Sequence, residues 1–268
     1  MSKPVIKWSG SKRSQAKIIK SLFPCDYETY YEPFVGGGSV LYELNPVKAV
    51  AGDICHPLIS LWKAIQNNPR DIYRGYKERW EFFRRDAEFF YDVRDRFNKA
   101  YIPDPCDFLF LTRTCMNGLI RFNKNGKFNT SCHIGRNGIN PERLYGILLE
   151  WNARIKNTEF LCADFNDTLS TSTKKDIVYL DPPYQNTKGM YSCKLNTDSL
   201  FECLENLNTR GVRWIMSYDG KSGGIDKTCD IPLELYKKHE YIQSGISSFK
   251  RIVTKEKSMV YESLYKNF

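Results

Sequence analysis

The sequence predicts an α/β fold in which a mostly parallel β-sheet is interrupted by a helical insertion. Short apolar runs, typical of buried strands, alternate with helical segments in residues 1–56 and again in residues 141–268. The first of these regions joins a strand, a glycine-rich loop, a helix and a second strand. In residues 57–140 the apolar spacing becomes helical and a hairpin signal follows. We therefore expect one α/β domain made of the two outer regions and an inserted domain between them.

The first α/β region is predicted to contain two helices and two strands. Residues 11–22 have the apolar spacing of a helix. YETYYEP is a short strand that enters the loop FVGGGS, and residues 39–44 start a helix directly after it. VKAVAGD is the second strand, which ends in Asp53.

The insertion begins where the period changes. Leu58, Leu61 and Ile65 share one helical face, and aromatic residues continue the helical pattern to about residue 98. We expect these aromatic residues to form the core of a helical subdomain. Residues 107–117 are predicted to be helical again, and RFNKNGKFNTS, with its Asn-Gly pair, predicts a hairpin.

The second α/β region returns to buried strands. Asn140 and Pro141 predict the start of a helix with an apolar stripe. Four stretches are then predicted as strands: TEFLCAD, DIVYLD, RWIMSYD and SMVYESLY. A helix over residues 198–209 separates two of them.

Composition limits the classes of function. Hydrophobic residues are 41% and charged residues 26% of the chain, which predicts a soluble globular protein. No apolar run is long enough to span a membrane, and the N-terminus lacks the apolar centre of a signal peptide. The nine cysteines form no C-x-x-C pair and only three histidines are present. We therefore expect reduced thiols, a cytoplasmic location and no metal site.

The basic charge is concentrated in one stretch. The net charge of the whole chain is +9. Residues 113–143 contain six lysines and arginines against one acid, Glu142, which gives a local balance of six minus one, or +5. This stretch is the candidate face for a polyanion.

The glycine loop predicts a ligand site at the first strand. Gly36 and Gly38 lie between a strand and a helix, where glycine lets the backbone turn tightly and approach a ligand. Asp53 ends the next strand, where an acid can accept hydrogen bonds from both hydroxyls of a ribose. The pattern fits a dinucleotide-binding fold, a methyl-donor fold or only a tight turn. Because no Gly-Lys-Ser/Thr follows, a P-loop is excluded.

The stretch DPPY, which ends the apolar run DIVYL, predicts an acceptor site for an amine. Asp181 can supply a carboxylate and Pro182 a backbone carbonyl, and these would accept the two N–H bonds of an exocyclic amine on a nucleobase. The consecutive prolines stiffen the corner. Tyr184 would stack on the base after it has left the duplex. The alternative is an Asx-type turn after a strand, with no chemical role.

These motifs occur in a known order. IKWSGSK, EPFVGGGS, the hairpin stretch MNGLIRFNKNGKFN and DPPY follow one another over most of the chain. In this the chain resembles the adenine-N6 DNA methyltransferases of the alpha group, the family of the Dam methylases. The resemblance implies a Rossmann-like methyltransferase sheet, with residues 57–140 as an inserted target-recognition domain. It also implies S-adenosylmethionine as cofactor and double-stranded DNA as partner.

The resemblance also assigns residues to roles. Asp181, Pro182 and Tyr184 are the expected catalytic residues. Residues expected to hold the cofactor come from five segments, and Asp181 is among them: Trp8, Lys12, Glu32, Phe34, Gly36, Gly38, Asp53, Asp164, Phe165 and Asp181. Residues expected to contact DNA come from the N-terminal motif, the hairpin and the C-terminal loop: Lys7, Asn117, Leu119, Arg121, Lys124, Lys127, Arg136, Lys250 and Arg251.

Within the hairpin, Arg121 is the expected base reader, because the arginine fork pairs with the O6 and N7 atoms of guanine. Lys124, Lys127 and Arg136 are expected to contact phosphates. The chain departs from the family in two places. Ser131 stands at or near a proline that enzymes reading GATC usually have, which leaves the recognition sequence open. IMSYDG stands where many members have Ser-Asn.

The leading hypothesis is a site-specific DNA methyltransferase that transfers a methyl group to adenine N6 after base flipping, as part of restriction-modification, viral DNA protection or regulation in a prokaryotic or viral setting. We expect a monomer or a weak dimer. Two alternatives stay open. One is cytosine-N4 methylation, in which the same acceptors serve another exocyclic amine. The other is a non-catalytic DNA-binding regulator with the same fold.

Overall fold

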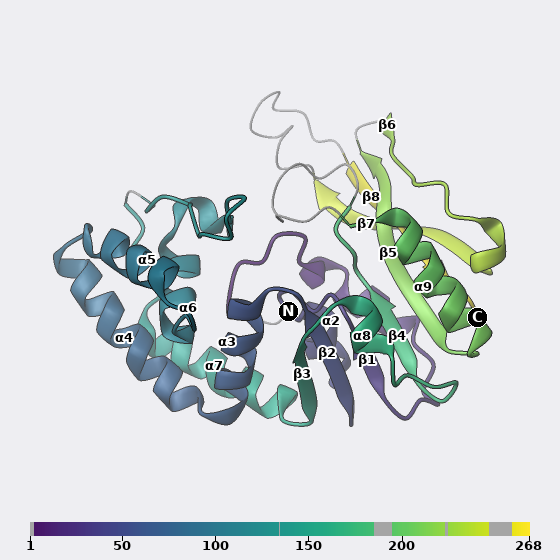
Figure 1. The fold of residues 1–268 in the computed structure, drawn as a ribbon, viewed down its shortest axis with the longest axis horizontal. Coiled ribbons are helices and arrows are strands. Elements are labelled where there is room, and N and C mark those ends of the chain that lie inside the picture. The colour runs from purple at the N-terminus through teal and green to yellow at the C-terminus, as the bar shows by residue number, and fades with distance from the viewer. Residues whose placement is uncertain (1–2, 134, 185–194, 223–224, 247–258) are drawn as a thin grey trace.

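The computed structural model of the protein describes residues 3–133, 135–184, 195–222, 225–246 and 259–268 (Figure 1). In this part of the chain, eight strands form one sheet in the order β3-β2-β1-β4-β5-β8-β7, with β6 paired to β5. The strands are β1 (Tyr30–Glu32), β2 (Ala49–Asp53), β3 (Thr158–Cys162), β4 (Ile177–Leu180), β5 (Arg213–Ser222), β6 (Ile225–Asp226), β7 (Lys238–Ile246) and β8 (Met259–Lys266).

The five strands from β3 to β5 in this order are parallel, and β8 and β7 add an antiparallel edge. The order 3-2-1-4-5 is that of a doubly wound, Rossmann-like sheet. The direction of winding reverses between β1 and β4. Ligands of such sheets bind outside the carboxyl ends of the strands at this reversal, so the topology places a site after β1 and β4.

The helices flank this sheet. Those of the α/β part are α1 (Ala16–Ser21), α2 (Ser39–Leu44), α7 (Pro141–Ile155), α8 (Phe165–Leu169) and α9 (Thr197–Thr209). Those of the predicted insertion, residues 57–140, are α3 (His56–Asn67), α4 (Pro69–Arg85), α5 (Phe89–Lys99) and α6 (Pro105–Thr114). Short 3-10 turns occur at Lys12–Ser14, Met116–Gly118 and Leu233–Leu235. None of the helices in the described ranges is long and apolar enough to cross a membrane.

Alternating side chains of the central strands pack into two hydrophobic cores, one on each face of the sheet. Along β4, Ile177 and Tyr179 join the core on one face, whereas Val178 and Leu180 join the core on the other. This two-residue period is the one a pleated strand imposes, and it explains why a strand buried on both faces has a continuous apolar sequence. Helices α8 and α9 cover the second face, and Figure 1 shows both in front of the sheet.

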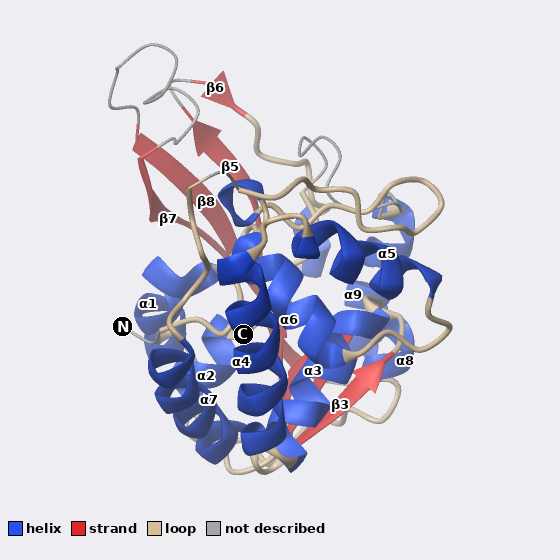
Figure 2. Ribbon diagram, turned by 90° about the vertical axis from the view of Figure 1, so that its left-hand side faces the viewer, coloured by secondary structure: helices blue, strands red, loops and turns tan. Residues whose placement is uncertain are grey.

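The insertion shares the core of the first face. Residues of α3 to α7 pack in one cluster with residues of α1, α2 and the strands. Figure 1 shows these helices gathered beside the β3 edge, and Figure 2 shows β5, β7 and β8 projecting beyond the helical layer. Asp107 of α6 is 1% exposed and is held by Arg79 and Arg96, with Arg96 Nε 2.9 Å from its Oδ2. One buried carboxylate therefore ties α4, α5 and α6 together.

The strands and helices predicted from the sequence are present with small shifts at their ends. The helix expected over residues 11–22 is divided into a 3-10 turn and α1, and the helix expected over 107–117 ends at Thr114. Asn140 caps α7 as expected, accepting hydrogen bonds from the N–H groups of Glu142 and Arg143. Three elements were not predicted: α8, β6 and β7.

Candidate functional site

The loops that carry the predicted motifs follow four neighbouring parallel strands. The glycine loop follows β1, Asp53 ends β2, Asp164 follows β3 and Asp181 follows β4. Because these strands are parallel, all four segments lie at one edge of the sheet. This is the edge that the topology marks as a ligand site.

The glycine loop is held in a left-handed conformation. Gly36 and Gly38 have φ values of 45° and 64°. A Cβ atom added to Gly36 would lie 2.5 Å from Nε1 of Trp8, so the indole of the N-terminal motif packs directly on the loop. On the other side, Trp62 of α3 donates a hydrogen bond of 3.0 Å to the carbonyl oxygen of Gly36. The insertion thus braces the loop that the sequence assigned to the cofactor.

Asp53 lies beneath this loop and is 8% exposed. Its Oδ2 accepts a hydrogen bond of 3.1 Å from the N–H of Gly36, and its Oδ1 accepts one of 2.9 Å from the N–H of Cys55. Burial raises the pKa of Asp53 to about 6, and these two N–H groups oppose the rise. Each carboxylate oxygen keeps a second lone pair, so the residue can still accept a hydroxyl.

An aromatic wall joins the ends of β1 and β3. The rings of Phe34 and Phe165 stack with centroids 5.4 Å apart and planes inclined by 28°. Asp164 is exposed beside them and caps α8 by accepting a hydrogen bond of 3.0 Å from the N–H of Asn166. The structure therefore brings Phe34 together with Phe165 and the adjacent Asp164.

The corner after β4 is built around a buried ion pair. Lys12 is 4% exposed, and its Nζ lies 2.7 Å from Oδ1 of Asp181 and 3.7 Å from Oε2 of Glu262. A lysine is rarely this buried unless it is paired. Burial raises the pKa of Asp181 to about 6, and the ammonium group of Lys12 opposes the rise. The carboxyl group of Asp181 is therefore ionised at neutral pH, with a pKa about one unit below it.

Glu32 lies next to this pair, at the end of β1, and is 3% exposed. Its Oε2 accepts hydrogen bonds of 2.8 Å from the hydroxyl of Tyr30 and 3.1 Å from the N–H of Leu41. Burial raises its pKa to about 8, and the charge of Asp181 adds to the rise. A carboxyl group that is mostly protonated at neutral pH thus anchors α2 to β1 from below the glycine loop.

Tyr184 closes the corner. Nζ of Lys12 lies 5.0 Å from the centre of its ring, and the ring meets Tyr218 of β5 edge to face at 5.9 Å. Its hydroxyl is buried and makes no hydrogen bond within the described structure. Ser217, beside Tyr218, bonds to the hydroxyl of Tyr179 in β4. The Tyr184–Tyr218 contact therefore lies on the face covered by α8 and α9, whereas the Tyr179–Ser217 bond lies on the opposite face of the sheet.

The predicted hairpin is present and is held at three points. Cys115 pairs with Cys132 and Phe122 with Phe128 in isolated antiparallel bridges. The side chain of Asn98, at the end of α5, makes two hydrogen bonds with the backbone of Phe128, of 2.8 and 3.0 Å. Ile120 of one arm and Phe128 of the other are buried in the core that the helices share, so both arms are fixed to the helical part.

The seven predicted DNA-contacting side chains that lie within the described residues are exposed on and around this hairpin. Arg121 is exposed and its Nε donates a hydrogen bond of 2.8 Å to Oδ1 of Asn129 across the hairpin. Lys7 packs against the hairpin, because a Cβ atom on Gly118 would lie 2.6 Å from its Cδ. Leu119 is 39% exposed. Lys124, Lys127 and Arg136 are also exposed. Lys250 and Arg251 lie outside the described residues.

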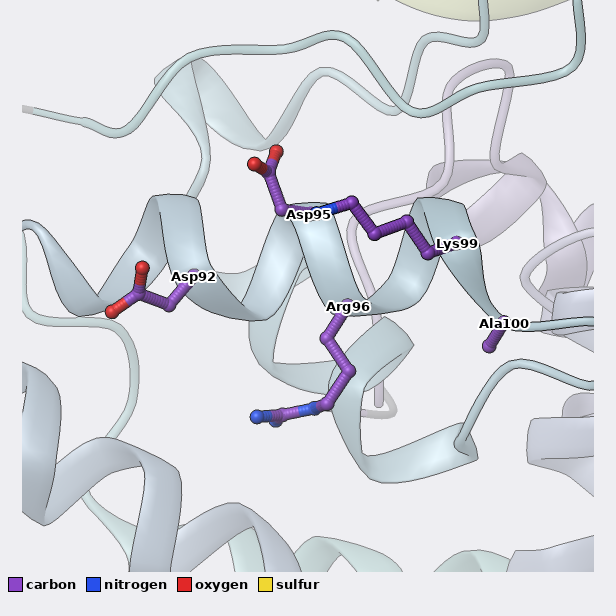
Figure 3. Close-up of a pocket in the computed structure, with 5 residues that line it drawn as sticks. All are labelled: Asp92, Asp95, Arg96, Lys99 and Ala100. Carbon is purple, nitrogen blue, oxygen red and sulfur yellow. The ribbon is translucent and has the colours of Figure 1, made fainter.

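A cavity of about 290 Å³ separates the hairpin from the sheet edge. Trp8, Ile54 and Cys55 line it from the α/β part, and Ile120 and Phe122 line it from the hairpin. A second hollow runs along the surface of α5, and Figure 3 shows its residues. There Asp95 points to one side of the helix and Arg96 to the other.

Several residues of the site were not predicted. Glu262 of β8 and Gln15, whose Nε2 donates a hydrogen bond of 2.9 Å to Oε2 of Glu262, complete the surroundings of Lys12. Trp62 and Asn98 position the glycine loop and the hairpin. No local motif marks these positions. Their roles follow from tertiary contacts between segments that are far apart in the sequence.

Known proteins share this sequence pattern. A family model described as D12 class N6 adenine-specific DNA methyltransferase matches residues 8–260. The chain belongs to this family. It is an adenine-specific, site-specific DNA methyltransferase, and the family resemblance expected from the motifs is confirmed.

Curated relatives of the methyltransferase come from an archaeon, a virus and bacteria. The type II methyltransferase M.MjaIII of Methanocaldococcus jannaschii is 36% identical, with 68% of this chain and 69% of the relative aligned. The type II methyltransferase M.CviBI of Paramecium bursaria Chlorella virus NC1A is 31% identical over the same shares. The DNA adenine methylase of Haemophilus influenzae is 32% identical over 68% of this chain and 64% of its own.

Among solved structures, the rRNA methyltransferase aviRa of Streptomyces viridochromogenes aligns with all of this chain and 85% of its own. Its TM-score of 0.44 and identity of 13% are too low to bear on substrate.

Proposed function

We propose that the methyltransferase uses S-adenosylmethionine to methylate N6 of an adenine that has been flipped out of duplex DNA, with Asp181 as the central catalytic residue. The observation that carries this proposal is the buried pair of Asp181 and Lys12, 2.7 Å apart, at the stiff corner after β4. A fixed carboxylate next to an aromatic ring, at the ligand-binding edge of the sheet, suits an amine on a planar base.

The residues at this edge fit the cofactor. The glycine loop lets backbone approach the ligand, the carboxylate of Asp53 can accept ribose hydroxyls, and the stacked rings of Phe34 and Phe165 offer an apolar wall for adenine. Lys12, held beside Asp181 at the same edge, would offer its ammonium group to the carboxylate of the methionine part. When bound, S-adenosylmethionine supplies a methyl group on a sulfonium sulfur, which leaves as a neutral thioether.

The corner would activate the target amine by accepting its N–H bonds. The lone pair of an exocyclic amine is conjugated with the ring, which makes the nitrogen a poor nucleophile. Acceptance of one N–H by Asp181 and the other by the carbonyl of Pro182 favours a pyramidal nitrogen with a free lone pair. When the new C–N bond forms, the nitrogen loses one proton. Asp181, whose pKa is about 6, can hold that proton before it passes to water.

DNA would approach over the hairpin. Arg121 and the exposed lysines lie on the hairpin, and Lys7 links that surface to the N-terminal motif that reaches the site. We propose double-stranded DNA as the partner, with Arg121 reading a base and Lys124, Lys127 and Arg136 holding phosphates. Because the relatives come from prokaryotes and a virus, we propose a prokaryotic or viral setting, with the protein acting on DNA in the cytoplasm as a monomer or weak dimer.

One experiment tests the reaction, the base and the recognised sequence together. The protein is expressed in a host that lacks its own DNA methylases, and modified bases are mapped by long-read sequencing. We expect N6-methyladenine at one short sequence, and none in a host that expresses Asp181→Ala. N4-methylcytosine instead would favour the cytosine alternative, and unmodified DNA with retained binding would favour a non-catalytic regulator.

A further inference from the structure

The base of the hairpin contains two cysteines that face each other across an antiparallel pair. Cys115 follows α6 and Cys132 lies on the returning strand, and the two residues form an isolated bridge. The N–H of Met116 donates to the carbonyl of Ser131 at 2.8 Å, and the N–H of His133 donates to the carbonyl of Thr114 at 3.0 Å. The hydrogen bonds thus lie on either side of the cysteines.

This pattern makes Cys115 and Cys132 a non-hydrogen-bonded pair. The Cα atoms of such a pair are about 4.5 Å apart and their side chains project from the same face of the ladder. Their Cβ atoms are then about 4.5 Å apart. Both separations fall within the range of protein disulfides. In the structure both residues are free thiols, each donating to backbone carbonyls of its own segment.

From this geometry we propose that Cys115 and Cys132 are a thiol–disulfide site, which reacts with small-molecule disulfides such as glutathione disulfide and closes a ring across the base of the recognition hairpin. The sulfur of Cys132 attacks the disulfide, breaks its S–S bond and releases one glutathione thiol. The sulfur of Cys115 then displaces the second glutathione. Two protons and two electrons leave the protein, and one glutathione disulfide is reduced to two thiols.

The two sulfurs differ in access, which sets the order of these steps. Cys132 is partly exposed, whereas Cys115 is 2% exposed. Burial raises the pKa of both thiols, to about 12 for Cys115. Because the thiolate is the attacking species, exchange is slow at neutral pH and accelerates as the pH rises. In a reducing cytoplasm the pair stays open, and it closes when the glutathione pool becomes oxidised.

Closure would act on DNA recognition rather than on the chemical step. The ring encloses residues 116–131, which include Asn117 and Arg121, whereas Asp181 lies outside it. Formation of the S–S bond shifts the backbone at Asn117, whose φ is already 55°. The backbone between Asn117 and Arg121 moves with it. The KM for target DNA therefore rises, while the single-turnover rate at saturating DNA does not change.

To test this, the protein is incubated in glutathione buffers that contain an increasing fraction of glutathione disulfide. Cross-linked peptides are then mapped by mass spectrometry without reduction. We expect a Cys115–Cys132 peptide, a rise of about 5 °C in the unfolding temperature and a KM for DNA raised about threefold or more, all reversed by dithiothreitol. In Cys132→Ser these changes are absent, whereas Cys25→Ser, which removes an exposed cysteine elsewhere, keeps them.

Two results would overturn the proposal. One is the absence of this peptide in the most oxidising buffer while the protein remains folded. The other is a different pair in its place, such as Cys55 with Cys162, which are also near each other. An unchanged KM in a fully cross-linked protein would refute the effect on recognition. None of these results depends on which base is methylated, because the peptide map and the unfolding temperature are read without DNA.

Discussion

At the end of β4, the carboxylate of Asp181 is held by a lysine that is itself buried, under an aromatic ring and beside two prolines. On the hairpin, Arg121 is exposed and is held by one hydrogen-bonded partner on the opposite strand, Asn129. The corner at Asp181 is fixed by the sheet around it, whereas the two arms of the hairpin are paired only by isolated bridges in the described structure. Chemistry needs acceptors fixed before the substrate arrives, whereas recognition needs side chains that can adjust to a groove.

The largest effect is expected at the rigid region. Replacing Asp181 by alanine removes one N–H acceptor and any temporary proton holder, so single-turnover methylation falls by about 1,000-fold. Binding of S-adenosylhomocysteine, measured by calorimetry, stays within a few-fold, because the glycine loop and Asp53 are untouched. Asp181→Asn is the matched control for the buried lysine, since it keeps the shape without the charge. Full activity in Asp181→Ala would remove Asp181 from the mechanism, whereas full activity in Asp181→Asn would show that an uncharged acceptor suffices.

The next effect separates the two kinds of contact on the hairpin. Arg121→Ala is expected to lose about 10- to 100-fold of preference for the target over a sequence with one altered base pair, because a bidentate pair with guanine contributes about 1–3 kcal/mol. Lys127→Ala, on the same hairpin, is expected to weaken binding to all sequences alike and to reduce the salt dependence by about one phosphate contact. The sequence preference and the salt dependence of both variants are measured by DNA-binding titrations at several salt concentrations. If Arg121→Ala behaves like Lys127→Ala, Arg121 contacts only phosphate.

The same contrast explains what could be predicted from the sequence. The parallel strands were predictable because both faces are buried, which gives apolar runs such as IVYL, and the corner was predictable because Asp-Pro-Pro-Tyr follows such a run. Strand β7 was missed because KHEYIQSGI is polar at the sheet edge and is a strand through its pairing with β8. Helix α8 is too short to give a period.

Within the site, local motifs predicted the residues that touch the ligand edge but not the ones that position them. Lys12 was expected near the cofactor, and its pairing with Asp181 joins segments that are distant in sequence. Glu262 and Gln15 follow from the same packing. The hairpin was found from its Asn-Gly signal, yet the sequence that it recognises depends on how exposed side chains meet the bases. No pattern in one chain encodes that.

A smaller effect tests the charge balance of the corner. Because burial raises the pKa of Asp181 to about 6, and because the carboxylate is the active form, kcat/KM, which reports the free enzyme, falls as the pH is lowered through about 6. Lys12→Met removes the charge that opposes this rise, so the acid limb moves to higher pH and kcat/KM at pH 6 falls about tenfold relative to that at pH 8.

The measurement is a pH profile of kcat/KM, with Lys127→Met as the control for loss of an exposed positive charge. If the fall in kcat/KM at low pH occurs at the same pH in Lys12→Met, a group other than Asp181 causes it. Asp53, whose pKa burial also raises to about 6, is then the first candidate.

The smallest effect expected is that of a metal chelator. Among the described residues, no group of three or more histidine, cysteine, aspartate or glutamate side chains is placed to hold a metal ion. The acceptors proposed for the amine are a carboxylate and a carbonyl, which need no Lewis acid. We expect the rate to stay within about twofold when EDTA is added at fixed ionic strength, which matters because divalent ions also screen DNA phosphates. If EDTA abolishes the rate without changing DNA affinity, and one added metal restores it, the reaction needs a metal ion that Lys12 does not replace.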